Sequence, residues 1–235
     1  MEARVSAVPI VALDVPGVTA ALEIVDALGE SCRFYKVGSE LFTACGPAVV
    51  RELRAREADV FLDLKLHDIP NTVAGGLRGA ASLGARIVTV HAAGGEEMIR
   101  AAVQAANSAG NCAVFAVTLL TSLDASGIAR IWGRAEPVEV DTEVVRLAGI
   151  AKSGGAAGVV CSGREARAVK ARFGASIQLL IPGIRLAGGA THDQSRTATP
   201  AEAIAAGADY VVVGRAVTAA SDRVAAMREI LSQLG

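Results

Sequence analysis

The hydrophobic pattern of the chain alternates between short apolar runs and longer segments that carry an apolar residue every three or four positions. The short runs predict strands, and the longer segments predict amphipathic helices. The predicted strands cover residues 9–15, 34–39, 59–66, 86–92, 112–120, 158–162, 178–181 and 210–213. The predicted helices cover residues 18–28, 47–56, 72–83, 96–108, 141–153, 164–173, 200–206 and 217–231, and Asp141 is the expected cap of the fifth. Residues 123–140 are irregular and predict only short helices.

Eight strands that alternate with about eight helices predict an α/β fold, a single (β/α)8 TIM barrel over residues 1–235. A strand followed directly by a helix is typical of a parallel sheet that helices cover on the outside. No low-complexity linker divides the chain. In such barrels the active site lies at the carboxyl ends of the strands, so the residues at those ends are the candidates for function.

Composition narrows the class of protein. Apolar residues make up 52% of the chain and aromatic residues 3%, which predicts a core of Val, Ile, Leu and Ala. The net charge of −1 and the absence of a basic run disfavour broad binding to nucleic acid or to an anionic membrane. No apolar run is long enough to span a bilayer, and the N-terminus does not resemble a signal peptide. The four scattered cysteines lack metal-ligand spacing and are expected to be reduced thiols in a cytoplasmic protein.

The stretch 61–73, FLDLKLHDIPNTV, is central to the interpretation. Its first half alternates like a strand, so Asp63 and Lys65 share one face and lie roughly 6.5 Å apart along the backbone. An ordinary salt bridge on an exposed antiparallel sheet is the alternative interpretation. The flanking strand–helix pairs favour a parallel sheet, and a charged pair on the inner face of such a sheet is costly to bury. A functional role is therefore favoured.

Polar residues gather at the predicted strand ends. Taken singly, Asp14 could cap a loop, Lys36 could be a surface lysine and Arg215 could form a surface salt bridge. Because all of them are expected on one rim of the barrel, a functional role is favoured for each over these ordinary roles. The candidates at or near strand ends are Asp14, Lys36, Asp63, Lys65, Thr121, Arg185 and Arg215.

The ends of the last two strands predict an anion site. Arg185, Gln194 and Arg215 supply donors, Gly214 permits close approach of the backbone, and the glycine-rich loop 186–199 lies between these strands. Barrels of this kind often hold a phosphate there. The chain has no G-x-G-x-x-G motif after its first strand and no P-loop, which argues against the use of a dinucleotide or ATP.

The three histidines, His67, His91 and His192, are not spaced as a metal site. His67 could be a catalytic base, but we expect it to point to the side opposite Lys65 and to have a structural role. His91 ends a predicted strand and is a candidate for lining the pocket.

These motifs resemble the orotidine 5′-phosphate decarboxylase family in its bacterial cytosolic form. The resemblance spans nearly the whole chain, and residues 123–140 carry little of it. The matching motifs are ALD at 12–14, YKVG at 35–38, DLKLHDIPNTV at 63–73, LTS at 120–122, PGIR at 182–185, DQ at 193–194 and GR at 214–215. The resemblance implies removal of CO2 from orotidine 5′-phosphate to give UMP, the last step of UMP biosynthesis, without a metal or another cofactor.

The resemblance also implies catalytic roles. Lys65 would donate a proton to C6 and stabilise the carbanion-like charge that develops there. Asp63 would lie beside the departing carboxylate. Lys36 and Asp68 would complete an array of alternating charges that keeps Lys65 in place and protonated.

By the same resemblance, Asp14 and Lys36 would bind ribose hydroxyls, and Thr121 would contact the pyrimidine or its surroundings. Gln194, Gly214 and Arg215 would hold the phosphate, with Arg185 nearby, and the loop 186–199 would be mobile until substrate binds. The family further implies a homodimer with shared active sites. The residues expected to reach the site of the partner subunit are Asp68, Ile69 and Thr72.

Two other functions stay open at this point. A metal-dependent relative that acts on sugar phosphates, of the 3-keto-gulonate 6-phosphate type, shares the Asp-x-Lys-x-x-Asp pattern. A nucleotide-binding barrel without catalysis belongs to a different class of function. Retained activity in a chelator argues against the first, and turnover of the nucleotide argues against the second.

Overall fold

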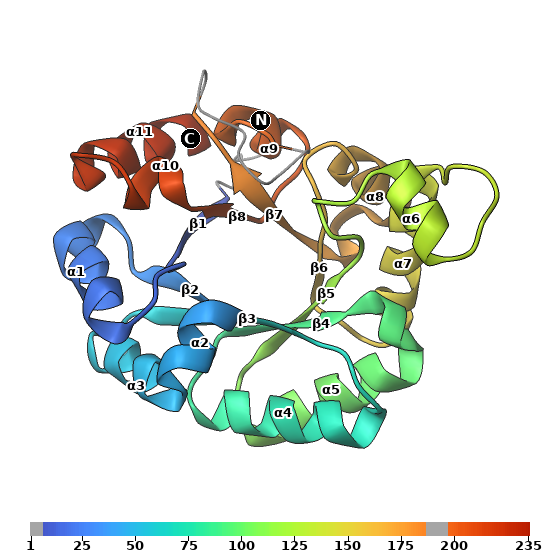
Figure 1. Cartoon of the computed structure of the whole chain (residues 1–235), viewed down its shortest axis with the longest axis horizontal. Helices are drawn as coiled ribbons and strands as arrows, with labels where there is room; N and C mark the ends of the chain where they lie inside the picture. The colour runs from blue at the N-terminus through green and yellow to red at the C-terminus, as the bar shows by residue number, and fades with distance from the viewer. Residues whose placement is uncertain (1–6, 187–196) are drawn as a thin grey trace.

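Parallel strands close into a barrel in the computed structural model, which describes residues 7–186 and 197–235. Neighbouring strands pair in sequence order, and β1 pairs with β8 to close the sheet (Figure 1). The strands are β1 (Val8–Ala12), β2 (Phe34–Gly38), β3 (Asp59–Leu66), β4 (Ile87–His91), β5 (Ala113–Val117), β6 (Gly158–Val160), β7 (Gln178–Ile184) and β8 (Tyr210–Val213). The predicted (β/α)8 barrel is confirmed.

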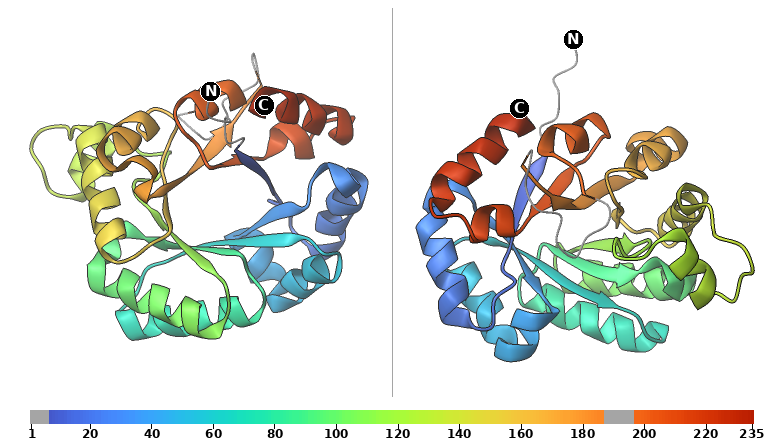
Figure 2. Two further views of the ribbon diagram at one scale, coloured as in Figure 1. Left: turned by 180° about the vertical axis from the view of Figure 1, so that it is seen from behind. Right: turned by 45° about the horizontal axis from the view of Figure 1, so that its top comes forward.

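Helices surround the sheet on its outside, as both views in Figure 2 show. The helices are α1 (Val18–Leu28), α2 (Ser39–Cys45), α3 (Pro47–Ala55), α4 (Pro70–Ser82), α5 (Gly95–Ala109), α6 (Ala125–Ile131), α7 (Val140–Ser153), α8 (Ala166–Phe173), α9 (Pro200–Ala205), α10 (Arg215–Thr218) and α11 (Arg223–Leu234). Across the described residues, none of these helices combines the length and the apolar character needed to cross a membrane.

Three local predictions are wrong. The helix α2 follows β2 directly and was not predicted, because its single buried residue, Leu41, gives too short an apolar pattern. The last helix is divided into α10 and α11, because the Asp222 side chain accepts a hydrogen bond from the Ala225 N–H and starts a new helix. Asp141 is not the cap of α7, which begins one residue earlier, so its carboxylate lies in the first turn.

Apolar packing occupies two layers. Inside the barrel, the side chains of Phe34, Phe61 and Phe115 form one cluster with residues such as Ile10 and Leu180. Three of the five phenylalanines of the chain are thus used to fill the barrel interior. A second cluster, built mainly from aliphatic residues, packs the outer face of the sheet against the helices. The barrel is therefore a packed core and not a pore, and the polar strand ends lie above it.

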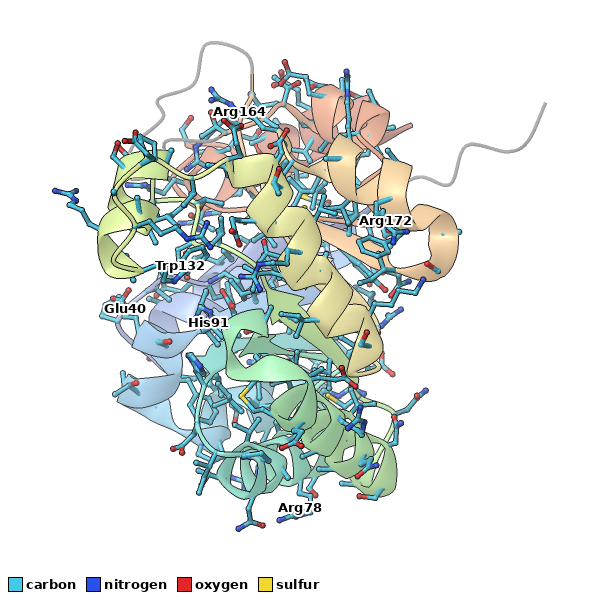
Figure 3. All side chains as sticks on the ribbon, turned by 90° about the vertical axis from the view of Figure 1, so that its right-hand side faces the viewer. Glu40, Arg78, His91, Trp132, Arg164 and Arg172 are labelled. Carbon is cyan, nitrogen blue, oxygen red and sulfur yellow. The ribbon has the colours of Figure 1, made fainter. Side chains whose placement is uncertain are left out.

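Charged side chains on the outer helices lie at the edge of the molecule, as Glu40 and Arg78 do in Figure 3. The four cysteines are free thiols, and three of them are buried. In the irregular region 123–140, α6 is capped by Asp124, whose side chain accepts a hydrogen bond from the Gly127 N–H. Where short helices were predicted, the region holds one, α6.

Candidate active site

A pocket of about 480 Å³ lies at the carboxyl ends of the strands. Its walls come from strand ends and the loops that follow them, as expected for this fold. The predicted site residues that line it are Asp14, Lys36, Asp63, Lys65, Thr121, Arg185, Gly214 and Arg215. One cavity thus brings together side chains that lie up to 201 residues apart in the sequence, from position 14 to position 215.

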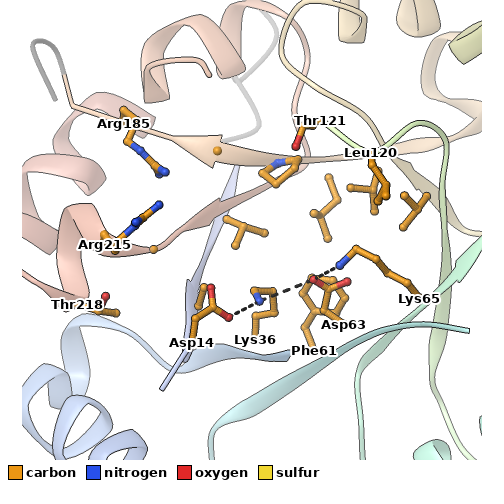
Figure 4. Close-up of a pocket in the computed structure, with 18 of the residues that line it drawn as sticks. Asp14, Lys36, Phe61, Asp63, Lys65, Leu120, Thr121, Arg185, Arg215 and Thr218 are labelled. Atoms are coloured by element: carbon orange, nitrogen blue, oxygen red, sulfur yellow. Dashed lines mark hydrogen bonds and ion pairs between the residues drawn. The ribbon is translucent and has the colours of Figure 1, made fainter. Parts of the chain in front are cut away.

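Four of these side chains form a continuous row of alternating charge, which we call the charged row: Asp14, Lys36, Asp63 and Lys65. The Lys36 Nζ atom lies 2.8 Å from Asp14 Oδ1 and 3.7 Å from Asp63 Oδ2. The Lys65 Nζ atom donates a hydrogen bond of 2.7 Å to the same Asp63 Oδ2 atom. Figure 4 shows the row crossing the floor of the pocket from β1 to β3.

The charged row is largely removed from solvent at its centre. The side chain of Lys36 is 10% exposed and that of Asp63 is 14% exposed, whereas that of Asp14 is 59% exposed. Burial by itself would raise the pKa of the Asp63 carboxyl, but the positive charges of Lys65 and Lys36 outweigh it and hold that pKa below its usual range. Asp63 is therefore held as an anion between two ammonium groups.

Glycine at position 38 allows Lys36 and Asp14 to meet. A Cβ atom there would lie 3.0 Å from Lys36 Nζ and 3.2 Å from Asp14 Oδ1. Both contacts are tighter than ordinary van der Waals packing allows. The small residue at the end of β2 therefore leaves the space in which the outer half of the charged row forms.

The end of β3 carries a β-bulge. Leu62 pairs with Val88 and Leu66 pairs with Val90, so three residues, 63–65, lie opposite the single residue Thr89. Within the bulge Lys65 has φ +49°, the left-handed region that side chains other than glycine seldom adopt. Bulges commonly re-aim a side chain next to an active site, and this bulge lies where Asp63 and Lys65 enter the pocket.

Two arginines form the side of the pocket across from Lys65, which we call the arginine wall, and Arg215 lies nearer the Asp14 end of the charged row because β8 pairs with β1. Arg185 follows β7 and Arg215 begins α10, and Figure 4 shows both guanidinium groups directed into the pocket. The register of β7 against β8 also shifts, between Ile181 and Ile184, and Gly183 has φ +77° there. Two guanidinium groups on adjacent strand ends suit an anion, because each presents a planar fork of donors.

Comparison with known proteins agrees with this geometry. Residues 8–230 match the family model described as Orotidine 5′-phosphate decarboxylase / HUMPS family. The chain belongs to this family. It is 49% identical to an orotidine 5′-phosphate decarboxylase of Halorhodospira halophila over 96% of this chain and 94% of that one. It is 51% identical to one from Anaeromyxobacter sp. strain K, over 95% of this chain and 96% of that one.

A solved structure of orotidine 5′-phosphate decarboxylase from Lactobacillus acidophilus superposes with a TM-score of 0.87 at 35% identity, covering 97% of this chain and 99% of that one. The resemblance to the decarboxylase family found in the sequence motifs is therefore confirmed. The match extends over the strands and helices alike, so the whole barrel is shared.

Three predicted residues lie outside the pocket of this single chain. Asp68, Ile69 and Thr72 are exposed around the start of α4, and none of them lines the cavity. The Asp68 Oδ1 atom accepts a hydrogen bond of 2.6 Å from the Ile69 N–H. Their expected role in a partner's site stays a prediction. Gln194 and most of the loop 186–199 lie outside the described residues.

The two described histidines lie beside each other, with ring centroids 5.5 Å apart, and neither lines the pocket. His67 is exposed, and His91 is half-buried at the end of β4. Burial, and then the charges of His67 and Lys65, lower the pKa of His91. Among the described residues, no group of three His, Cys, Asp or Glu side chains is arranged to hold a metal ion.

Sequence analysis of this decarboxylase-family chain missed Thr89. Its hydroxyl donates a hydrogen bond of 2.9 Å to Asp63 Oδ1 and accepts one of 3.0 Å from the Lys65 N–H. A polar residue in the otherwise apolar run IVTV at 87–90 was an available clue. Apolar residues such as Phe61 and Leu120 also line the pocket and were not predicted.

Proposed function

We propose that this chain is a cytoplasmic orotidine 5′-phosphate decarboxylase, which converts orotidine 5′-phosphate to UMP and CO2 in the last step of UMP biosynthesis. The observation that carries the proposal is the presence, in one pocket, of a charged row that is buried at its centre and of two arginines at the ends of β7 and β8. A substrate with a reacting carboxylate at one end and a phosphate at the other suits that division. The family membership and the names of the relatives support the same reaction.

Lys65 is the proposed catalytic acid. As the bond between C6 and the carboxylate carbon breaks, CO2 leaves and the electron pair remains on C6. The Lys65 ammonium stabilises that charge and then transfers a proton to C6, after which solvent reprotonates the amine. Its hydrogen bond to Asp63 supports this role, because that contact holds the Lys65 side chain in the pocket.

Asp63 is proposed to lie beside the carboxylate that leaves. Its lowered pKa supports an anion at neutral pH. Repulsion between the two carboxylates would be relieved as CO2 departs, while the interaction with Lys65 strengthens as charge builds on C6. Lys36, which contacts both Asp14 and Asp63, keeps the row neutral overall and holds Asp63 in place.

The remaining polar residues are proposed to bind the nucleotide. Asp14, with its exposed carboxylate, and Lys36 would bind ribose hydroxyls, and Thr121 would contact the pyrimidine. No metal or organic cofactor is required, because the side chains themselves supply the cation and the proton.

The phosphate is proposed to bind at the arginine wall. Gly214, Arg215 and Gln194 would hold it, with Arg185 nearby, and the loop 186–199 would close over it. A phosphodianion held away from the reacting carbon can supply binding energy that assists the chemical step. Among the described residues, a Cβ at Gly214 would meet only one atom, at 4.0 Å, which is consistent with a ligand approaching the backbone there.

The assembly is proposed to be a homodimer with shared sites, in which Asp68, Ile69 and Thr72 enter the partner's pocket. The 67% exposure of Ile69 supports an interface, because a large apolar side chain at the start of a helix gains by being covered. Mixing inactive Lys65→Ala and Asp68→Ala proteins should restore part of the activity, since each heterodimer then has one intact site. Confirmed heterodimers without recovered activity would contradict shared sites.

The ultraviolet absorbance of orotidine 5′-phosphate provides the test of the reaction. Purified protein in excess chelator should convert the substrate to UMP with release of one CO2. A folded protein without this activity would contradict the proposal. Magnesium-dependent turnover of a sugar phosphate would then favour the metal-dependent alternative, and tight UMP binding without turnover would favour a nucleotide-binding barrel.

A further inference from the structure

The strand β4 places one polar residue in the interior of the barrel. Ile87 faces the inner apolar cluster, and Thr89, two residues further, shares that face because side chains alternate along a strand. Thr89 is 0% exposed. A buried hydroxyl is costly unless its hydrogen-bonding capacity is used, so its partners indicate what it does.

Both partners of Thr89 belong to the charged row. The hydroxyl donates to the Asp63 Oδ1 atom at 2.9 Å and accepts from the backbone N–H of Lys65 at 3.0 Å. A hydroxyl has one hydrogen to donate and lone pairs to accept, so a single group can serve both contacts. It thereby links the side chain of Asp63 to the main chain of Lys65.

The position of Thr89 opposite the bulge explains why the contact matters. Residues 63–65 lie across from Thr89 alone, and a bulge leaves a residue without its usual partner in the ladder. The Thr89 hydroxyl supplies the acceptor for the Lys65 N–H instead. Lys65 at φ +49° has an unfavourable backbone conformation, which the surrounding contacts must maintain.

We propose that Thr89 is a positioning residue, whose hydroxyl fixes the orientation of the Asp63 carboxylate and the backbone of Lys65 so that the two side chains meet in the reacting arrangement. The two carboxylate oxygens have separate partners, since Oδ1 accepts from Thr89 and Oδ2 accepts from Lys65 Nζ. Rotation of the carboxylate is therefore restricted. Thr89 does not line the pocket, so it acts through its neighbours.

This inference rests on the proposed decarboxylation, and a matched control is available directly after β5. Thr118 is also buried, at 3% exposure, and its hydroxyl donates to the Val160 carbonyl at 2.8 Å. Among the described hydrogen bonds, none joins Thr118 to Asp63 or Lys65. Loss of its hydroxyl removes a comparable buried hydrogen bond outside the charged row.

The test compares Thr89→Val, Thr89→Ser and Thr118→Val by steady-state decarboxylation of orotidine 5′-phosphate. Thr89→Val should lower kcat by about 10- to 100-fold, because the catalytic pair is no longer held in place, while KM changes by less than about threefold. Thr89→Ser keeps the hydroxyl and should retain kcat within about threefold of the native value. Thr118→Val should do the same, even if it lowers the melting temperature as much as Thr89→Val does.

Native kcat in Thr89→Val, or equal losses in Thr89→Val and Thr89→Ser, would overturn the proposal. If Thr89→Val does not fold, Thr89→Ala removes the same hydroxyl with less disturbance of packing. A crystal structure of the hydroxyl-free variant gives a readout independent of activity. In that structure the Lys65–Asp63 contact should be longer, or the Lys65 backbone should leave the left-handed region. Unchanged geometry would contradict the positioning role, whether or not the native protein is active on this substrate. Inactivity of the native protein would by itself contradict only the proposed reaction.

Discussion

The carboxyl ends of β3 and β7, on opposite walls of the pocket, are built alike and used differently. Each strand shifts register against its neighbour near its end, and each contains a residue with a left-handed backbone there. At β7 that residue is Gly183, with φ +77°. At β3 it is Lys65, with φ +49°.

Glycine adopts this conformation readily, but a residue with a Cβ atom pays roughly 1–2 kcal/mol for it. The bulge of β7 therefore shapes the backbone without strain and leaves binding to the neighbouring arginines. The bulge of β3 retains a strained lysine. Buried or pocket-lining residues with such strain cluster at active sites, which agrees with a chemical role for Lys65.

The charges on the two walls also indicate different uses. The charged row alternates in sign from Asp14 to Lys65, so it is compensated within the protein. The described pocket-lining residues of β7, β8 and α10 include Arg185 and Arg215 but no acid. We infer that the β3 wall performs the chemistry and that the arginine wall binds the phosphate.

Removal of the Lys65 ammonium should have the largest effect. Lys65→Ala should lower kcat by at least about 10⁴-fold, because one change removes both the proton donor and the cation beside C6. Steady-state decarboxylation measures it. The matched control is Lys152→Ala, which should leave kcat unchanged. Lys152 lies on α7 and donates a hydrogen bond to the Ser176 hydroxyl at the surface. Substantial kcat in Lys65→Ala would remove Lys65 from the chemistry.

Loss of the Arg215 guanidinium should weaken binding. Arg215→Ala should reduce the affinity for UMP by about 10- to 100-fold, because charge-assisted hydrogen bonds to a phosphate contribute about 1.5–3 kcal/mol. Isothermal titration calorimetry measures the affinity. Arg215→Lys keeps the positive charge but not the planar guanidinium, so its affinity for UMP should lie between those of Arg215→Ala and the native protein. Unaltered affinity for UMP would place the phosphate elsewhere.

Backbone strain at the two bulges predicts a smaller effect on stability with opposite signs. Gly183→Ala should lower the free energy of unfolding by about 1–2 kcal/mol, because alanine is strained at positive φ. Lys65→Gly should be about 1 kcal/mol more stable than Lys65→Ala for the same reason. Urea denaturation measures both. At an ordinary strand position the glycine variant is less stable than the alanine variant. If Lys65→Gly were likewise less stable than Lys65→Ala, the backbone of Lys65 would not be strained.

The Asp63 carboxyl predicts the smallest effect, on the acid side of the stability profile. Its folded pKa lies below the ordinary value of 3.8, so its contribution to stability is fully present above that pH and is lost as pH falls through the folded pKa. The free energy of unfolding of the native protein should therefore decrease more steeply below pH 3.8 than that of Asp63→Asn. Parallel profiles in urea titrations would show that the charged row does not stabilise the fold.

Much of the architecture could be predicted, because the barrel and the charged face of β3 follow from periodicity. The alternation that assigns Asp63 and Lys65 to the pocket, and Leu62, Leu64 and Leu66 to the outer packing, is confirmed. The clustering of strand-end residues followed from the rule that parallel strands end on one side. Local helix boundaries were harder to predict, because α2 and α10 are short, with seven and four residues.

The bulge of β3 and the role of Thr89 could not be predicted, because both depend on pairing between strands. Neither the register shift nor the left-handed backbone of Lys65 leaves a mark in the order of residues. Sequence alternation even describes β3 as regular. The placement of Asp68, Ile69 and Thr72 is beyond a single chain for a related reason: their proposed partners belong to a second subunit.

The division between a chemical wall and a phosphate wall is tested most directly by removing the phosphate from the substrate. The measurement is kcat/KM of Arg215→Ala and of native protein for orotidine, which has the reacting carboxylate but no phosphate, alongside orotidine 5′-phosphate. Arg215→Ala should be strongly impaired on the phosphorylated substrate and equal to native protein on orotidine within about threefold, since uniform loss is expected only where the missing contact serves both substrates. An equal loss on both substrates would mean that Arg215 supports the chemistry itself, and the two walls would not be separate.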